Sequence, residues 1–274
     1  DYSGTNGIHL GHWEGNGYLD GTMGKAYILN RALTPEEVRA VFDAEQKTFN
    51  DHVTIRRTAE RPRIDGRFDD DCWKGQAALD YFTKVDYDSS PAEKPTAVRL
   101  SFDDDNLYVA ARCDDPDGST ITARPRNRDD PRVMDDDRLE LFISTRNGSY
   151  HHLVLTAANV LRDRKCDFEI ERNGYAPGGF SKFDADTSWD CRRIQTAVQK
   201  SDGAWLAEMA IPLSELGGVK ERAGWRVNVA RFHVQAKETS SFSPLFERLD
   251  QPALFSSLRF AGETAVLERA TKKS

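Results

Sequence analysis

The stretch AVRLSFDDDNLYVAARCDDP, Ala97–Pro116, decides the fold class of this chain. Apolar residues alternate with polar ones on both sides of an acidic turn, as they do when two strands each bury one face and a short turn reverses the chain. Similar short β-rich runs, separated by Asp, Asn, Gly and Pro clusters, recur at Leu139–Ser144, His151–Thr156, Ala204–Ile211 and Trp225–Arg231. This pattern predicts an all-β fold, a two-sheet antiparallel β-sandwich of immunoglobulin-like or jelly-roll-like type.

The five tryptophans divide between this core and the rest of the chain. Trp73, Trp205 and Trp225 lie in alternating runs and are predicted to be buried. Trp189 stands at a strand entrance and is a candidate to contact a ligand. The stretch Glu171–Ser188 is rich in Gly, Asp and Ser and predicts a loop at one rim of the sandwich.

The first 47 residues follow a different pattern. Lys25–Asn30 predicts a short strand, and Thr34, Pro35 and Glu37 form a helix start with a capping hydroxyl, a proline and a glutamate three residues after the cap. The helix is expected to run to about Gln46 and to pack through one apolar stripe, made of Val38, Val41 and Phe42. We therefore predict an N-terminal strand-helix fragment at residues 1–47, a linker at 48–53, the sandwich at 54–262 and a tail at 263–274.

The phrase YLDGTMGKAYILNRALTPEEV, Tyr18–Val38, resembles the closing segment of laminin-G-like, concanavalin-type lectin domains. The resemblance implies that residues 1–47 are the C-terminal fragment of such a jelly-roll domain, whose body would lie upstream. Trp13 would pack against this fragment. A piece of this size buries too little surface to fold alone, so we expect it to pack on a neighbour.

A series of phrases after the linker resembles the family 9 carbohydrate-binding modules and their wider β-sandwich relatives. The phrases follow in the family's order over about residues 55–260: IDGRFDDDCW, FDDDNLYVAARCDDP, DRLELFIS, GAWLAEMAIPLSELG, GWRVNVAR and FSSLRF. The resemblance implies a module that binds a polysaccharide or oligosaccharide and catalyses no reaction. It also implies a secreted or cell-surface multidomain protein, in which the module targets a polysaccharide-active enzyme to its substrate.

The same resemblance implies the position of the ligand site. Sugar-binding members hold a terminal sugar between two tryptophans, whose places here are taken by Met134 and Leu249. Glu140 matches an acidic residue that contacts sugar hydroxyls. The family's neighbouring arginine falls near Val154, and His152 is the nearest polar replacement. We therefore expect weak binding through Glu140 and His152, with Trp189 as a further candidate.

Carboxylates are dense in the expected loops. Calcium takes six to eight oxygen ligands from such groups, and Asp129, Asp130 and Asp135 are the favoured ligands because relatives of the family hold cations near this loop. The alternative is that these residues are solvated turn formers. Calcium is thus an expected cofactor only if the loop gathers them.

The four cysteines are widely spaced and have no zinc-like pattern. Cys166 and Cys191 are the candidates for a disulfide because they flank a predicted hairpin, and four unpaired thiols are the alternative.

Two other function classes stay open at this point. A structural or protein-interaction module needs no ligand site, and a haem-binding sandwich would use Met134 as an axial ligand, although no haem is expected because no clear partner ligand is evident.

The sequence has none of the common catalytic motifs. Its 45 acidic and 38 basic residues give a net charge of -7 without a basic stripe, which argues against a nucleic-acid partner. No apolar run is long enough to span a membrane. An extracellular, periplasmic or cell-surface location is expected.

Overall fold

The computed structural model describes ten parts of the chain, residues 12–13, 17–18, 31–38, 52–86, 90–115, 121–170, 180–201, 203–217, 222–245 and 248–261. The chain divides into two compact units, Asp1–Ala44 and Glu45–Ser274. Within the described ranges, no helix has the length and apolar character needed to cross a membrane.

The first unit contains the predicted helix start. A helical turn spans residues 35–38. The amide N–H of Glu37 donates to Oγ1 of Thr34 at 3.2 Å, and the amide N–H of Thr34 donates to Oε2 of Glu37 at 2.9 Å. These reciprocal hydrogen bonds satisfy two amides that a helix end leaves without partners, so the predicted capping box is confirmed.

Other predictions for this unit fare differently. The side chain of Val38 is 53% exposed, and the packing of the helix on a neighbour stays a prediction. The predicted strand at Lys25–Asn30 and the residues Val41 and Phe42 lie outside the described residues. The backbone of β1 (His12–Trp13) pairs with that of β2 (Gly17–Tyr18) in a short antiparallel ladder.

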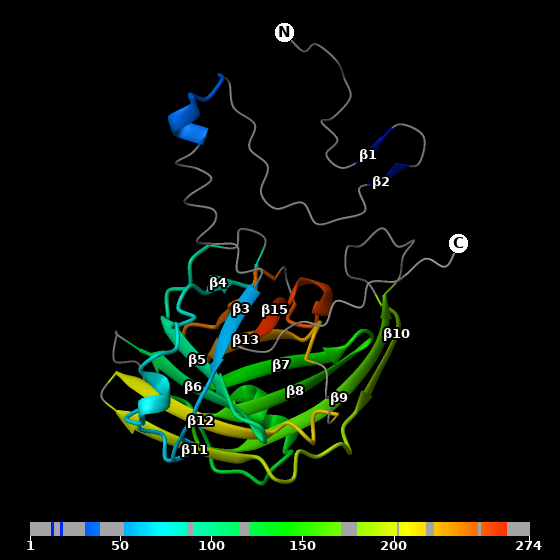
Figure 1. The fold of residues 1–274 in the computed structure, drawn as a ribbon. Helices are drawn as coiled ribbons and strands as arrows, with labels where there is room; N and C mark the ends of the chain where they lie inside the picture. The colour runs from blue at the N-terminus through cyan, green and yellow to red at the C-terminus, as the bar shows by residue number, and fades with distance from the viewer. Residues whose placement is uncertain are drawn as a thin grey trace. The chain divides into compact units, whose positions relative to one another are not determined.

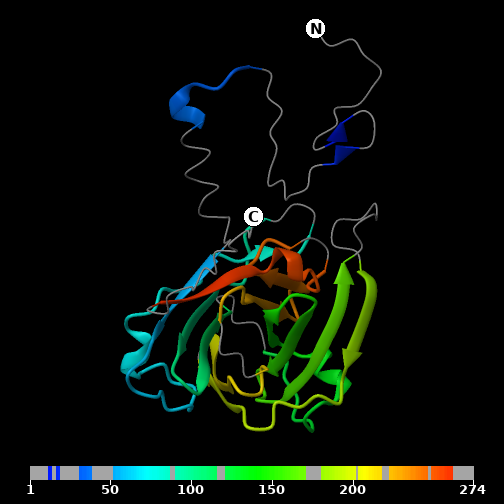
Figure 2. The ribbon, with the colours of Figure 1, turned by 45° about the vertical axis from the view of Figure 1, so that its right-hand side comes forward.

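The second unit is a curled sheet whose strands follow the order β10-β9-β8-β7-β13-β15-β3-β5-β6-β12-β11; off this path, β14 pairs with β13, and β4 pairs with β14. Figures 1 and 2 show how the sheet curls until its two halves face each other. The strands are β3 (His52–Arg57), β4 (Thr83–Lys84), β5 (Thr96–Phe102), β6 (Asn106–Asp114), β7 (Arg138–Arg146), β8 (Ser149–Thr156), β9 (Leu161–Ile170), β10 (Phe180–Asp186), β11 (Gln195–Ser201), β12 (Ala204–Pro212), β13 (Arg226–His233), β14 (Glu238–Ser241) and β15 (Ser256–Ala261). Three short 3-10 helices lie between them, η1 (Asp71–Trp73), η2 (Pro131–Asp135) and η3 (Pro252–Leu254).

One hydrophobic core fills the space between the halves. Side chains from β5, β6 and β12 in one half meet those from β7, β8 and β13 in the other. Trp205 and Trp225 belong to this core and are 0% and 1% exposed. Trp73 is also buried, in a separate cluster with Tyr108. The predicted all-β sandwich and the burial of all three tryptophans are confirmed, because alternating side chains place every second residue in the core.

The strands foreseen from alternation are all present, and two details differ from the prediction. β3 runs parallel to both β15 and β5, so the sheet is mixed and not wholly antiparallel. The predicted loop at Glu171–Ser188 was wrong for residues 180–186, which form β10 paired with β9. β10 is an edge strand, and its backbone is hydrogen-bonded to β9 on one side. A strand can therefore form here although most of its side chains are polar.

A buried carboxylate ties two of the quoted phrases together. Glu208 of β12 is 0% exposed and accepts hydrogen bonds from the amides of Asp65 and Gly66 at 3.0 and 2.7 Å. The indole N–H of Trp73 donates to the other oxygen of Glu208 at 2.9 Å. Gly66 has φ +82°, a conformation that favours glycine, and a Cβ there would meet Gln199 at 3.1 Å. The turn at Asp65 is thus fixed on the outer surface of β12.

The four cysteines are free thiols. The predicted Cys166–Cys191 disulfide is therefore not formed. Cys166 packs with Tyr150 and Phe142 on the outer face of β8 and β7, whereas Cys191 belongs to the core between the two halves. The sheet itself separates the two sulfur atoms, which spacing along the sequence does not reveal.

Candidate functional site

The outer face of β7, β8 and β9 carries the residues that the sequence singled out. Glu140 on β7 lies directly across from Val154 on β8, and His152 lies across from Arg164 on β9. Because side chains alternate along a strand, these residues point away from the core that Leu141 and Leu153 fill.

A chain of hydrogen bonds crosses this face. Oε1 of Glu140 accepts from Nε of Arg138 at 2.7 Å, and Oε2 of Glu140 lies 2.8 Å from Nε2 of His152. Nε of Arg164 donates to Nδ1 of His152 at 3.1 Å. The ring of His152 stacks on Phe142 with the ring centroids 4.2 Å apart. Since Nδ1 accepts a hydrogen bond, the imidazole is neutral and its proton lies on Nε2, from which it is donated to Glu140.

The charges of this network agree with that assignment. Burial lowers the pKa of His152, and the nearby Arg164 and Arg138 lower it further, against the opposite effect of Glu140. Burial alone would raise the pKa of Glu140, but the hydrogen bonds and charges of His152 and Arg138 outweigh it and lower the pKa to about 2. At neutral pH, Glu140 is therefore an ion whose charge is compensated within the protein.

A small hollow opens on the same face. It is lined by Met134, His152, Val154, Arg162, Asp163 and Arg164. Met134 belongs to η2 and is partly exposed, and its carbonyl accepts from Arg138 at 2.6 Å. Leu249 is partly buried and packs against the outer cluster that contains Phe142 and Tyr150. The structure thus brings Met134, Glu140, His152 and Leu249 to one face.

Burial changes the roles expected of two of them. Glu140 is 2% exposed and does not line the hollow, so a ligand in the hollow does not reach its carboxylate directly. His152 is 4% exposed and forms part of the floor. Both ring nitrogens of His152 are engaged by Glu140 and Arg164, so His152 is not free to pair with Met134 as a second axial haem ligand.

Trp189 does not belong to this site. Its ring contacts His151 with the centroids 4.6 Å apart, and it packs against the core between the two halves. His151 and His152 are consecutive in β8 and therefore point to opposite faces of the sheet. The expectation that Trp189 joins Glu140 and His152 at one ligand is corrected by this alternation.

Arg162 and Arg164 were not foreseen as site residues. They alternate with Asp163 and Lys165 along β9, so both arginines face the hollow. Asp163 also borders the hollow, but its carboxylate accepts from the amide of Cys191 and from Arg128. Recognising LRDRKCDFEI, Leu161–Ile170, as a strand beside His151–Thr156 would have placed them there. The polar content of that stretch hid the strand.

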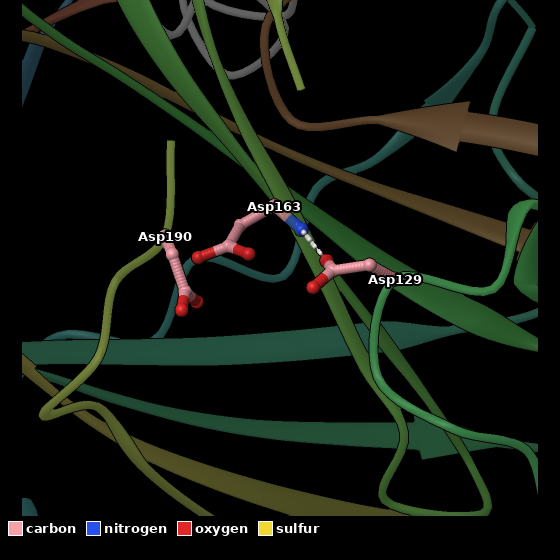
Figure 3. Close-up of side chains that lie close together, drawn as sticks. All are labelled: Asp129, Asp163 and Asp190. Carbon is pink, nitrogen blue, oxygen red and sulfur yellow. Dashed lines mark hydrogen bonds between the residues drawn. The ribbon is translucent and has the colours of Figure 1, made fainter. Parts of the chain in front are cut away.

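The predicted metal ligands do not come together. Asp130 accepts from both the amide and Nε of Arg132, each at 2.9 Å, at the start of η2. Asp135 is exposed. Among the described residues, Asp129 gathers instead with Asp163 and Asp190, whose ligand atoms lie within 4.8 Å of one another. Figure 3 shows the three side chains and the hydrogen bond from the amide of Asp163 to Asp129.

The arginine next to Asp129 occupies the middle of this acidic cluster. The Arg128 guanidinium pairs with Asp163 at 2.9 Å, with Asp129 at 3.5 Å and with Asp190. One oxygen of Asp163, Oδ1, is buried without a hydrogen-bond partner in the described structure, and burial raises the pKa of this carboxyl. Because Arg128 already supplies a positive charge and the cluster offers few oxygens, the residues do not fit a calcium ion as they stand.

Comparisons with known proteins agree with the fold. A proposed carbohydrate-binding protein from Bacteroides uniformis ATCC 8492 superposes with a TM-score of 0.57 at 14% identity, over 77% of this chain and 99% of that one. A family 9 carbohydrate-binding module from Caldicellulosiruptor kristjanssonii in complex with cellotriose gives 0.51 at 15% identity, over 78% of this chain and 95% of that one. A family 9 carbohydrate-binding module from the same organism, in complex with glucose, gives 0.50 at 15% identity, over 78% of this chain and 99% of that one. No curated protein matches the chain.

The sequence profile of one family covers most of the second unit. The family is described as "Carbohydrate family 9 binding domain-like", and the match extends over residues 64–242, from the turn that Glu208 fixes to the end of β14. This chain belongs to the carbohydrate family 9 binding domain-like family.

Proposed function

We propose that the β-sandwich is a non-catalytic module that binds a polysaccharide or an oligosaccharide. The observation that carries the proposal is the coincidence of the family match with a small hollow on the face of β7, β8 and β9, which both charged and apolar residues line. Two of the family's expected ligand positions, Met134 and His152, line that hollow. The shared fold with modules in complex with cellotriose and glucose supports a sugar ligand.

The fixed network under the hollow suits binding better than catalysis. Glu140 and His152 hold each other and the two neighbouring arginines in place, which presents polar groups to a ligand without a movable acid and base. Hydrolysis of a glycosidic bond uses two carboxyl groups that flank the bond. Glu140, the carboxylate nearest His152, is 2% exposed and is held by Arg138 and His152, so it is not free to act on such a bond.

We further propose that the module works outside the cytoplasm, in a secreted or cell-surface protein, where it keeps a polysaccharide-active enzyme near its substrate. Tethering raises effective concentration without any new contact, so a weakly binding module is useful in such a protein. The N-terminal resemblance to a lectin-like domain supports a multidomain parent chain.

Affinity electrophoresis of the purified chain through gels that contain soluble polysaccharides tests the proposal. Cellulose derivatives, xylan, galacturonan and a sulfated glycan form the panel, and a gel without polysaccharide is the reference. We expect retardation in at least one gel, abolished by Met134→Asp, which places a charge in the hollow. Unchanged mobility in every gel would contradict the proposed function. An absorbance scan of the same sample tests the haem alternative, because bound haem absorbs intensely in the violet.

A further inference from the structure

The two arginines of the hollow differ in charge balance from several other arginines that the structure describes. Arg128, Arg132, Arg138 and Arg193 each form an ion pair with a carboxylate. Within the described ranges, Arg162 forms no hydrogen bond and no ion pair, and Arg164 forms its one hydrogen bond to the neutral Nδ1 of His152. Both side chains are partly exposed and line the hollow. Their two positive charges are therefore available to a ligand.

The acidic groups near the hollow are engaged elsewhere. Glu140 is buried between Arg138 and His152. The carboxylate of Asp163 accepts from the amide of Cys191 and from Arg128, on the other side of β9. Asp250, beside Tyr150 and Cys166, pairs with Arg248 at 3.2 Å. None of these three carboxylates pairs with Arg162 or Arg164 in the described structure.

The arrangement also orients one of the guanidinium groups. Nε of the Arg164 guanidinium is bound to His152, and the two terminal nitrogens of this guanidinium have no partner in the described part of the chain. A guanidinium binds a planar carboxylate, or two oxygens of a sulfate, through two parallel hydrogen bonds. Because His152 already holds the Arg164 guanidinium, this group loses less conformational freedom when it binds a carboxylate or a sulfate.

We propose that this hollow binds an anionic sugar residue, with Arg162 and Arg164 pairing with its carboxylate or sulfate group. This inference rests on the proposed function and names its ligand class, an acidic polysaccharide. Charge here takes the place of the aromatic clamp, since Met134 and Leu249 offer no ring on which a neutral sugar would stack. The carboxylate of a uronic acid is the planar group that matches the guanidinium fork best.

Titration calorimetry with matched ligands tests the inference. The probes are an oligogalacturonate, its methyl ester, a sulfated oligosaccharide, the unsulfated parent of that oligosaccharide, and cellotriose. We expect the oligogalacturonate to bind at least about tenfold more tightly than its methyl ester, and this preference to shrink as salt is added. Preference for the sulfated probe over its parent, without preference for the uronate, would assign the sulfate instead.

Three variants locate the effect. Arg162→Gln and the double variant Arg162→Gln, Arg164→Gln should lose the preference for the acid and keep any binding of the neutral probes. Arg112→Gln removes a partly exposed arginine from β6 in the other half of the sandwich and should change nothing. Thermal unfolding confirms that each variant is folded, and Arg162→Gln disturbs no hydrogen bond of the described structure.

The outcomes separate the two proposals. If neutral and acidic probes bind equally well, or if Arg112→Gln costs as much affinity as the double variant, the inference is wrong and the proposed function stands. If no probe binds, the proposed function fails and the inference falls with it.

Discussion

His152 and Arg164 share a hydrogen bond in which the histidine is the acceptor, with Nδ1 of the ring 3.1 Å from Nε of the arginine. The proton of His152 therefore lies on Nε2, where it is donated to Glu140. Glu140 accepts hydrogen bonds from both Arg138 and His152, and His152 in turn accepts one from Arg164. Glu140 is therefore the anchor of the whole face.

Replacing that anchor should unfold the site. In Glu140→Gln the side-chain NH2 group faces either Nε–H of Arg138 or Nε2–H of His152, so two buried donors point at each other. We expect the free energy of unfolding to fall by about 3 kcal/mol, the range found when one partner of a buried ion pair is removed. Urea unfolding at pH 7 measures it. Asp104→Asn, at a 78% exposed side chain, is the control and should change stability by less than about 0.5 kcal/mol.

Acid should destabilise the sandwich through His151. Burial lowers the pKa of His151 to about 4, and Lys165 adds to the effect. The folded state thus binds fewer protons than the unfolded chain between pH 6.5 and 4, so stability is present above about pH 6.5 and is lost as the pH falls through this window. From pH 7 to 5 we expect a loss on the order of 2 kcal/mol from this residue. His151→Gln should show a shallower dependence in urea unfolding, and an unchanged slope would contradict the assignment.

Glu208 should matter for stability and not for binding. Glu208→Ala leaves the amides of Asp65 and Gly66 and the indole of Trp73 without their acceptor in a buried site. We expect a loss of about 3 kcal/mol in unfolding free energy, because each buried donor that loses its partner costs 1 kcal/mol or more. Glu208→Gln, which keeps one acceptor oxygen, should recover part of the loss. Sugar affinity of the folded protein at low temperature should stay within about twofold of the natural chain.

Arg128 should substitute for a cation in the natural chain. In Arg128→Gln the carboxylates of Asp129, Asp163 and Asp190 repel one another without compensation. We expect calcium to raise the unfolding midpoint of this variant by several degrees relative to a chelator, and to have a much smaller effect on the natural chain. Differential scanning fluorimetry measures both. Arg132→Gln, which removes the partner of Asp130 outside the cluster, is the control.

An aromatic ring in the hollow should restore affinity for neutral sugars. Met134→Trp places an indole beside His152 at the rim, where stacking on a sugar ring is worth about 1 kcal/mol, or about fivefold in affinity. Calorimetry with cellotriose checks this result. Phe183→Trp enlarges an exposed ring on β10, outside the hollow, and should give no gain. Equal gains in the two variants would mean that the hollow is not the sugar site.

Alternation in the sequence was enough to predict the sandwich. Residues such as Leu139, Leu141 and Leu153 recur with period two, and any strand that buries them must turn the intervening residues outward. The same rule foretold the burial of Trp205 and Trp225. The alternation rule missed β9 and β10 because both strands are polar. They lie toward one edge of the sheet, where hydrogen bonds and not apolar contacts decide that a strand forms.

The outer face of β7, β8 and β9 shows where sequence reasoning stops. Sequence order and resemblance placed Met134, Glu140, His152 and Leu249 on one face, since each is fixed by a strand or a flanking turn. The pairing of β8 with β9 brought Arg162 and Arg164 to the hollow, moved Trp189 to the opposite side through His151, and set Arg128 among three carboxylates. The sequence by itself determined which side chains alternate along each strand, because that depends on local backbone geometry. Only the tertiary structure decided which charges meet, because neighbours in a sheet come from distant parts of the chain and their register depends on the packing of the whole core.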